Sequence, residues 1–116
     1  MSAYAAPSGF QVRTLRGEHA YRVNCTGRLT SEWTPVLKNE VKALFPVTGT
    51  VVLDFTEVSY MDSSGLGAVV GLYVSGKHLG CELRLVNFNQ RVRELLGLTH
   101  LLSALEACGE YLIKLP

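Results

Sequence analysis

The chain has 116 residues, a length typical of one domain and sufficient to bury a hydrophobic core. Hydrophobic residues make up 47% of it and charged residues 18%, which is an ordinary globular composition and excludes a disordered or fibrous chain. The 11 basic and 10 acidic residues leave a formal net charge of +1. A general nucleic-acid-binding surface normally carries a basic excess, so nucleic acid is not an expected partner.

The chain is predicted to begin with a flexible tail over residues 1–9, followed by a single domain over 10–116. The runs FQVRTLR (10–16) and HAYRVNC (19–25) alternate apolar and polar side chains. A short glycine-containing loop joins them, and this pattern predicts a β-hairpin.

A helix is predicted to follow the hairpin, because apolar residues recur at helical spacing from Trp33 to Phe45. Thr30 or Ser31 can cap its start, and Pro46 stands just beyond its end.

The central part of the chain alternates strands and helices. The run TVVLDF (50–55) is β-branched and almost entirely apolar, which is typical of a strand covered on both faces. A loop is predicted over 56–62, then a largely buried helix from 66 to about 77. A further strand is predicted over 81–86 and a further helix over 87–98. The alternation predicts one α/β domain whose first two strands are antiparallel.

The last segment, THLLSALEACGEYLIKLP (99–116), is ambiguous by periodicity. Its pattern is compatible with a helix that continues through Leu105 and a final strand over Tyr111–Leu115.

Cysteine usage and targeting signals indicate a cytoplasmic protein. Cys25, Cys81 and Cys108 are odd in number, show no CxxC pairing and lie among apolar residues, so reduced, buried thiols are expected. The three histidines have no metal-ligand spacing, and neither a metal nor a cofactor is predicted. The N-terminus is not expected to be a signal peptide. No apolar run approaches the roughly 20 residues that cross a bilayer, so no membrane association is expected.

The run SYMDSSGLG (59–67) carries the strongest local signal, because Asp62-Ser63-Ser64-Gly65 stands between a strand and a buried helix. A serine at the N-terminus of a helix can satisfy free backbone amides, so one of the two is predicted to cap the helix. The same position is where a phosphate dianion is best tolerated. Capping therefore does not exclude a second role.

The sequence contains no complete set of the catalytic residues of any enzyme class considered. A G-x-S-x-G elbow would need glycine where Met61 or Asp62 stands. Gly76-Lys77-His78 lacks the glycine spacing and the Ser/Thr of a phosphate-binding loop. Asp54 lacks the acidic cluster that would hold magnesium, and it is expected to be a strand-end residue that hydrogen-bonds to loop amides. The protein is therefore predicted not to be an enzyme.

The stretch VVLDFTEVSYMDSSGLGAVVGLY (51–73) resembles the signature of STAS domains, specifically that of bacterial anti-sigma factor antagonists. The run TGRL (26–29), the region CELRLVNFNQRVRELLGLTHLL (81–102) and the chain length follow the same layout, over roughly residues 10–115. The resemblance implies an α/β STAS fold, with a mixed sheet of four to five strands and about four helices packed mainly on one side.

The same resemblance changes the expectation for the C-terminal segment. The family layout makes Leu101–Leu105 the last strand and Ala107–Leu115 a C-terminal helix. We prefer this arrangement to the one from periodicity.

The resemblance also implies a function. In such proteins the serine after the aspartate, here Ser63, is phosphorylated by an anti-sigma factor that is also a serine kinase. The unphosphorylated protein binds this partner and frees the sigma factor, and a serine phosphatase reverses the modification. The expected partner-binding residues are Arg28, Thr30, Tyr60, Met61, Asp62, Ser63, Ser64, Gly65 and Leu66. Among them Tyr60, Met61 and Leu66 are expected to form an apolar docking patch that a phosphate would spoil.

Arg28 and Thr30 stand where family members carry acidic residues. Arg28 could pair with an acidic group on a variant partner or with phosphorylated Ser63, or it could be a solvated surface residue. The alternative function is a non-phosphorylated STAS scaffold subunit of a signalling or lipid-transport assembly, in which Ser63 only caps its helix. The intact Asp62-Ser63-Ser64-Gly65 run favours the antagonist.

Overall fold

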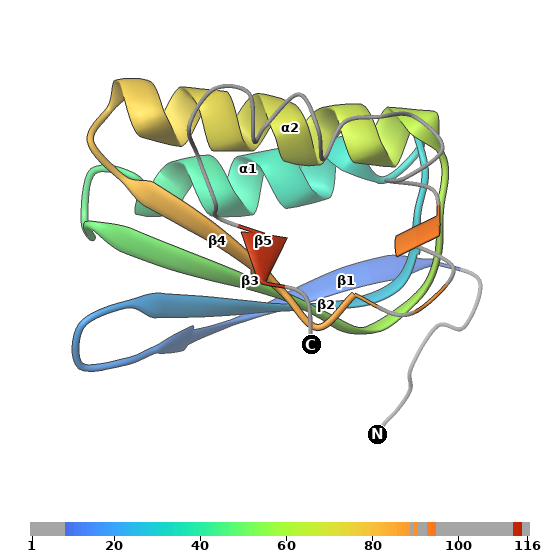
Figure 1. Ribbon diagram of the computed structural model, residues 1–116, viewed down its shortest axis with the longest axis horizontal. Coiled ribbons are helices and arrows are strands. Elements are labelled where there is room, and N and C mark those ends of the chain that lie inside the picture. The colour runs from blue at the N-terminus through green and yellow to red at the C-terminus, as the bar shows by residue number, and fades with distance from the viewer. Residues whose placement is uncertain (1–8, 89, 91–92, 95–112, 115–116) are drawn as a thin grey trace.

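One mixed β-sheet with helices on one of its faces forms the protein, in a computed structural model that describes residues 9–88, 90, 93–94 and 113–114 (Figure 1). The strands lie in the order β1-β2-β3-β4-β5, with β1 and β2 antiparallel and the remaining pairs parallel. The elements are β1 (Phe10–Arg16), β2 (Tyr21–Leu29), α1 (Thr34–Leu44), β3 (Thr50–Met61), α2 (Ser63–His78), β4 (Glu82–Val86) and the two-residue β5 (Ile113–Lys114).

The predicted hairpin is confirmed, with Arg16 opposite Tyr21 next to the loop. Strand β2 is longer than expected and passes through Gly27, whose φ of +104° lies in the left-handed region. A Cβ atom at Gly27 would collide with the carbonyl oxygen of Gly9, which also accepts the N–H of Arg28 at 3.0 Å. Glycine is therefore required where the start of β1 crosses close to β2.

Strand β3 does not end at Phe55 as predicted, because it continues through the expected loop to Met61. Its register with β2 shifts twice, between the pairings of Asn24 and Thr26 and again between those of Gly27 and Arg28. A β-bulge of this kind adds residues to one strand and breaks the alternation of side chains. The spacing of buried residues along β3 changes accordingly, so the second half of the strand does not show the alternation of apolar and polar residues that predicts a strand.

The hydrophobic core lies between the sheet and the two helices. Both helices cover the same face of the sheet (Figure 1). The largest side chains with less than 2% exposure are Phe55, Leu29, Leu37, Leu53, Leu72, Leu83, Leu85, Val23, Val41, Val51, Val58 and Val69. The strands β2, β3 and β4 and both helices contribute to this list, so the core joins these five elements.

Helix α1 begins without the predicted side-chain cap. Its N-cap is Trp33, and no side chain accepts a hydrogen bond from its first turn. The carbonyl oxygen of Thr30 instead accepts the N–H groups of Trp33 and Thr34, at 2.8 and 3.1 Å. A backbone turn therefore caps the start of α1, in place of the Thr30 or Ser31 side chain that was predicted to do so. The helix ends at Leu44, shortly before Pro46, as predicted.

Two of the roughly four expected helices, α1 and α2, are seen in full within the described residues. The helix predicted over 87–98 is wrong at its first two residues, because Asn87 and Phe88 are not helical, while positions 90, 93 and 94 are helical. The strand predicted over Leu101–Leu105 lies outside the described residues.

The predicted C-terminal helix over Ala107–Leu115 is wrong at Ile113–Lys114, which form β5. These two residues pair in parallel with Leu85 and Val86 of β4. The edge of β4 offers unpaired backbone groups, and pairing along it satisfies them in a way that a local helix would not. The strand that periodicity indicated at this position is the better description of these two residues.

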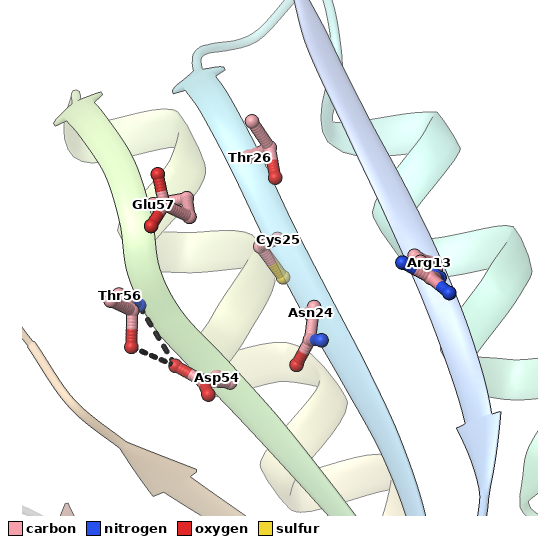
Figure 2. Close-up of a pocket in the computed structure, with 7 residues that line it drawn as sticks. All are labelled: Arg13, Asn24, Cys25, Thr26, Asp54, Thr56 and Glu57. Atoms are coloured by element: carbon pink, nitrogen blue, oxygen red, sulfur yellow. Dashed lines mark hydrogen bonds between the residues drawn. The ribbon is translucent and has the colours of Figure 1, made fainter.

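Asp54 links three parts of the sheet on the face opposite the helices. Its carboxylate accepts hydrogen bonds from both the hydroxyl and the backbone N–H of Thr56 (Figure 2). It also accepts hydrogen bonds from the guanidinium of Arg22 and from Nδ2 of Asn87 at 3.2 Å. Asp54 is thus a mid-strand residue and not the strand-end residue that was predicted. Partial burial alone raises the pKa of Asp54, but the hydrogen bonds from Thr56, Arg22 and Asn87 outweigh it and lower the pKa from 3.8 to about 2.

This lowered pKa predicts a loss of stability in acid. A group whose pKa is lower in the folded state stabilises the fold fully above its unfolded value, and this contribution disappears as the pH falls through the folded value. As the pH falls from 4 to 2, protonation of Asp54 weakens its ion pair and hydrogen bonds. The free energy of unfolding should therefore fall by about 1 kcal/mol, allowing for the partial exposure of Arg22. Urea titrations of wild type and Asp54→Asn should differ at pH 7 and converge near pH 2. Curves that stay equally far apart at both pH values would contradict this assignment.

Candidate functional site

The Asp-Ser-Ser-Gly run lies where β3 ends and α2 begins. Asp62 is the N-cap of α2, with extended backbone, and its Oδ1 atom accepts the N–H of Gly65 at 2.9 Å. Its carbonyl oxygen accepts the N–H of Leu66 at 3.0 Å, which is the first bond of the helix. The prediction that a serine caps this helix is therefore wrong. Aspartate is an equally good capping residue, and it stands one position earlier.

Because Asp62 supplies the cap, both serine side chains are left available. Ser63 and Ser64 are exposed and form the first two residues of α2. Their hydroxyls and their backbone N–H groups have no hydrogen-bond partner among the described residues. The first turn of α2 carries no acidic side chain. This end of the helix therefore presents free amides and the positive end of the helix dipole to solvent, an arrangement that favours an anion.

The start of α2 is fixed to the end of β2 through backbone contacts. The N–H of Asp62 donates to the carbonyl oxygen of Leu29 at 3.3 Å. Gly65 is buried against the same carbonyl group, and a Cβ atom added there would collide with that oxygen. The serines therefore sit on a helix end whose position is set by backbone atoms of two elements.

Two of the three residues expected to form an apolar docking patch are not on the surface. Met61 and Leu66 are 4% and 2% exposed and belong to the hydrophobic core, while Tyr60 is half-buried. The prediction of an apolar docking patch is therefore wrong for Met61 and Leu66. The bulge in β3 turns Met61 inward opposite Leu29, and Leu66 lies on the face of α2 that packs on the sheet. These two residues support the serine-bearing turn from beneath.

Arg28 and Tyr60 form a contact that the sequence did not reveal. The two residues are paired across β2 and β3, and the guanidinium carbon of Arg28 lies 4.4 Å from the centre of the Tyr60 ring. A cation at this distance over an aromatic face is a favourable cation–π contact. Arg28 is exposed and Thr30 half-buried. The contact depends on the register between β2 and β3, and the bulge makes this register impossible to read from the sequence.

The expected partner-binding residues therefore separate into two groups. Arg28, Thr30, Tyr60, Asp62, Ser63 and Ser64 have exposed or half-buried side chains. They come from the ends of β2 and β3 and from the start of α2, at one end of the sheet (Figure 1). Met61, Gly65 and Leu66 are buried beneath them. We call the first group the switch surface.

The described cysteines are unsuited to chemistry. Cys25 and Cys81 are buried and unpaired, and the burial confirms the expectation, while Cys108 lies outside the described residues. Burial, and secondarily the charge of Asp54, raises the pKa of Cys25 to about 12. Burial likewise raises the pKa of Cys81, with a smaller contribution from Glu82. Both groups are therefore protonated, weakly nucleophilic thiols at neutral pH.

No three His, Cys, Asp or Glu side chains gather as metal ligands would in the part of the chain that the structure describes. In the same residues, neither helix combines the length and the apolarity that are needed to cross a membrane.

Comparison with known proteins agrees with this fold. Residues 13–108 match the STAS domain family, and the chain belongs to that family. An anti-sigma-B factor antagonist of Bacillus subtilis (strain 168) is 32% identical over 90 residues, covering 78% of this chain and 83% of that protein.

Solved structures show the same architecture at lower sequence identity. An anti-sigma factor antagonist from Mycobacterium paratuberculosis has a TM-score of 0.74 at 20% identity, and the match covers 87% of this chain and 86% of that one. The Bacillus protein SpoIIAA in its phosphorylated form has a TM-score of 0.63 at 20% identity, covering 80% of this chain and 85% of that one. At these identities the likeness shows the fold alone.

Proposed function

We propose that this protein is an anti-sigma factor antagonist whose binding to an anti-sigma factor is controlled by phosphorylation of Ser63. In this proposal the partner is also the serine kinase, and a serine phosphatase restores the binding form. The protein acts in the cytoplasm as a regulatory binding protein, without a cofactor and without catalysis of its own. The names of its relatives support the class of function, since the Bacillus subtilis relative is an anti-sigma-B factor antagonist.

One observation carries the proposal for this chain: the exposed hydroxyl of Ser63 at the N-terminus of α2, which has no hydrogen-bond partner within the described part of the chain. A kinase can reach this hydroxyl without breaking a hydrogen bond, because Asp62 has taken the capping role. Ser64 is equally exposed. The choice of Ser63 rests on its position directly after Asp62, which the family resemblance assigns to the modified serine.

The switch that we propose acts through charge at the surface. A phosphate adds about −1.5 to −2 charges at neutral pH and three acceptor oxygens. It would lie beside the carboxylate of Asp62 and next to the free amides of the helix, so the helix end tolerates it while an interface does not. A 100-fold loss of affinity for the partner requires only about 2.7 kcal/mol of binding free energy. Since Met61 and Leu66 are buried, the phosphate acts on the polar rim of the switch surface and not on an apolar patch.

The test is to isolate the protein from its native cytoplasm under several growth conditions and to map phosphate by mass spectrometry. We expect phosphate on Ser63, its disappearance in Ser63→Ala and its persistence in Ser64→Ala. Because both serines are exposed and unbonded, neither substitution should disturb the fold, and the two variants are matched. A wild-type protein that carries no phosphate under any condition would contradict the switch and favour the alternative, a constitutive STAS scaffold subunit.

A further inference from the structure

The end of the sheet beside Ser63 is shaped by the two register shifts between β2 and β3. Each shift gives β3 an extra residue relative to β2. Bulges of this kind redirect side chains and are common beside functional sites. Here they bring Arg28 of β2 and Tyr60 of β3 directly opposite each other, in the last turns of chain before the serine-bearing helix begins.

Arg28 and Ser63 flank this end of the sheet from its two faces. Leu29, the residue after Arg28, is fully buried in the core beneath the helices, and successive side chains of a strand point to opposite faces. Arg28 therefore lies on the face opposite the helices, together with Tyr60. The carbonyl oxygen of Leu29 accepts the N–H of Asp62, so Arg28 and Ser63 are the chain neighbours of the two residues that this hydrogen bond joins.

The guanidinium of Arg28 is restrained without being neutralised. Its carbon lies 4.4 Å from the centre of the Tyr60 ring, so the ring covers one side of the group. Arg28 is exposed, and within the described part of the chain no carboxylate forms an ion pair with it. Because an aromatic ring accepts none of the in-plane N–H bonds that a carboxylate would, these donors stay available to an external acceptor.

The chemistry of this cation selects for a carboxylate. A guanidinium presents paired N–H donors whose spacing matches the two oxygens of a carboxylate. Of the residues that make up the switch surface, Arg28 alone is a cation and Asp62 alone is an anion. Oδ1 of Asp62 accepts the N–H of Gly65, so that carboxylate is committed to the helix cap. A partner that covers the switch surface must therefore supply an anion for Arg28 or leave a desolvated cation unpaired.

We propose that Arg28, restrained by the ring of Tyr60, recognises an aspartate or glutamate side chain of the anti-sigma factor and thereby selects among related partners. This inference rests on the proposed function and gives its partner a chemical feature. A phosphate on Ser63 adds negative charge beside a site that selects for negative charge, so modification and recognition oppose each other at one surface.

The test measures dissociation constants between the proposed anti-sigma factor partner and the full chain, prepared without phosphate. Arg28→Gln should weaken binding about tenfold, because it removes the cation. Arg28→Glu should weaken binding about 100-fold, because it also repels the carboxylate of the partner. Tyr60→Leu should weaken binding about threefold by releasing the guanidinium. Urea unfolding of each variant checks that it is folded under the conditions of the binding measurement.

Arg16→Gln and Arg16→Glu are the matched controls. Arg16 is likewise exposed on a strand, but it lies opposite Tyr21 next to the hairpin loop, at the other end of the sheet. Both variants should bind like wild type. Equal losses in the Arg16 and Arg28 variants would reveal a general attraction between opposite charges and overturn the proposal. An Arg28→Gln protein that binds like wild type would overturn it as well.

A reversal of charge on the partner identifies the carboxylate. Exposed acidic residues of the partner are replaced by lysine one at a time, and at least one replacement should restore binding to Arg28→Glu while weakening binding to wild type. The absence of any such rescue would overturn the proposal. A partner that binds wild type, is lost in Ser63→Glu and binds Arg28→Gln normally contradicts only the role of Arg28. A partner that does not bind wild type contradicts the proposed function and this inference together.

Discussion

Replacing Ser63 with glutamate is expected to weaken binding to the proposed anti-sigma factor partner by about 100-fold, or about 2.7 kcal/mol, while leaving the fold intact. The substitution places a negative charge beside Asp62 on the switch surface, where a partner would have to desolvate both carboxylates. It removes no hydrogen bond to any residue that the structure describes, because the serine hydroxyl makes none there. A carboxylate in the first turn of a helix is itself favourable by about 0.3–1 kcal/mol.

The measurement is the dissociation constant with the proposed anti-sigma factor partner, together with the free energy of unfolding. Asn39→Glu is a matched control, since it makes the same charge change at an exposed position in the middle of α1. The control should bind like wild type. If Ser63→Glu also binds like wild type, phosphate at this serine cannot act through charge. A Ser63→Glu protein with a lowered unfolding free energy would show instead that the serine supports the fold.

Gly65→Ala is expected to destabilise the fold by about 2 kcal/mol, although alanine is the better helix former by about 1 kcal/mol. The added methyl group would collide with the carbonyl oxygen of Leu29 and would also lie 3.0 Å from side-chain carbons of Leu29 and Met61. Relief requires the end of β2 and the start of α2 to separate. That movement stretches the hydrogen bond from Asp62 to Leu29. The midpoint of urea unfolding measures the effect.

Gly67→Ala is the matched control, two residues further along the same helix. Apart from its chain neighbours and the backbone of its own helix, a Cβ atom there has no heavy atom within 4 Å, so only the gain in helix propensity remains. This variant should be stabilised by about 0.5–1 kcal/mol. Two variants that shift the midpoint in the same direction would contradict the close contact between Gly65 and Leu29.

Local patterns were sufficient where side-chain periodicity survives in the sequence. The alternation in 10–16 and 19–25 identified the hairpin, and the apolar run TVVLDF identified the first half of β3. Long-range pairing was not visible in the same way. The bulge between β2 and β3 disguised the second half of β3 as a loop, and β5 is a strand because it pairs with β4.

The location of the switch surface was predictable from the sequence, but which of the expected residues are exposed and which are buried was not. Strand, Asp-Ser-Ser-Gly and buried helix follow one another in the sequence, so exposed serines at a helix start could be expected. Asp62 and Ser63 are both good capping residues, and the choice between them depends on where β3 releases the backbone. The inward orientation of Met61 depends on the strand register.

The anchoring of α2 to β2 through the carbonyl of Leu29 has a consequence for the evolution of such regulators. Position and orientation of the serine-bearing turn depend on main-chain atoms and one glycine, so outward side chains such as Arg28 and Thr30 can change at little cost to the scaffold. A genome can then hold several paralogues of one architecture, each fitted to its own partner by a few surface substitutions. Specificity between parallel regulatory routes would in that case be encoded in the outward side chains, while the serine-bearing turn stays the same.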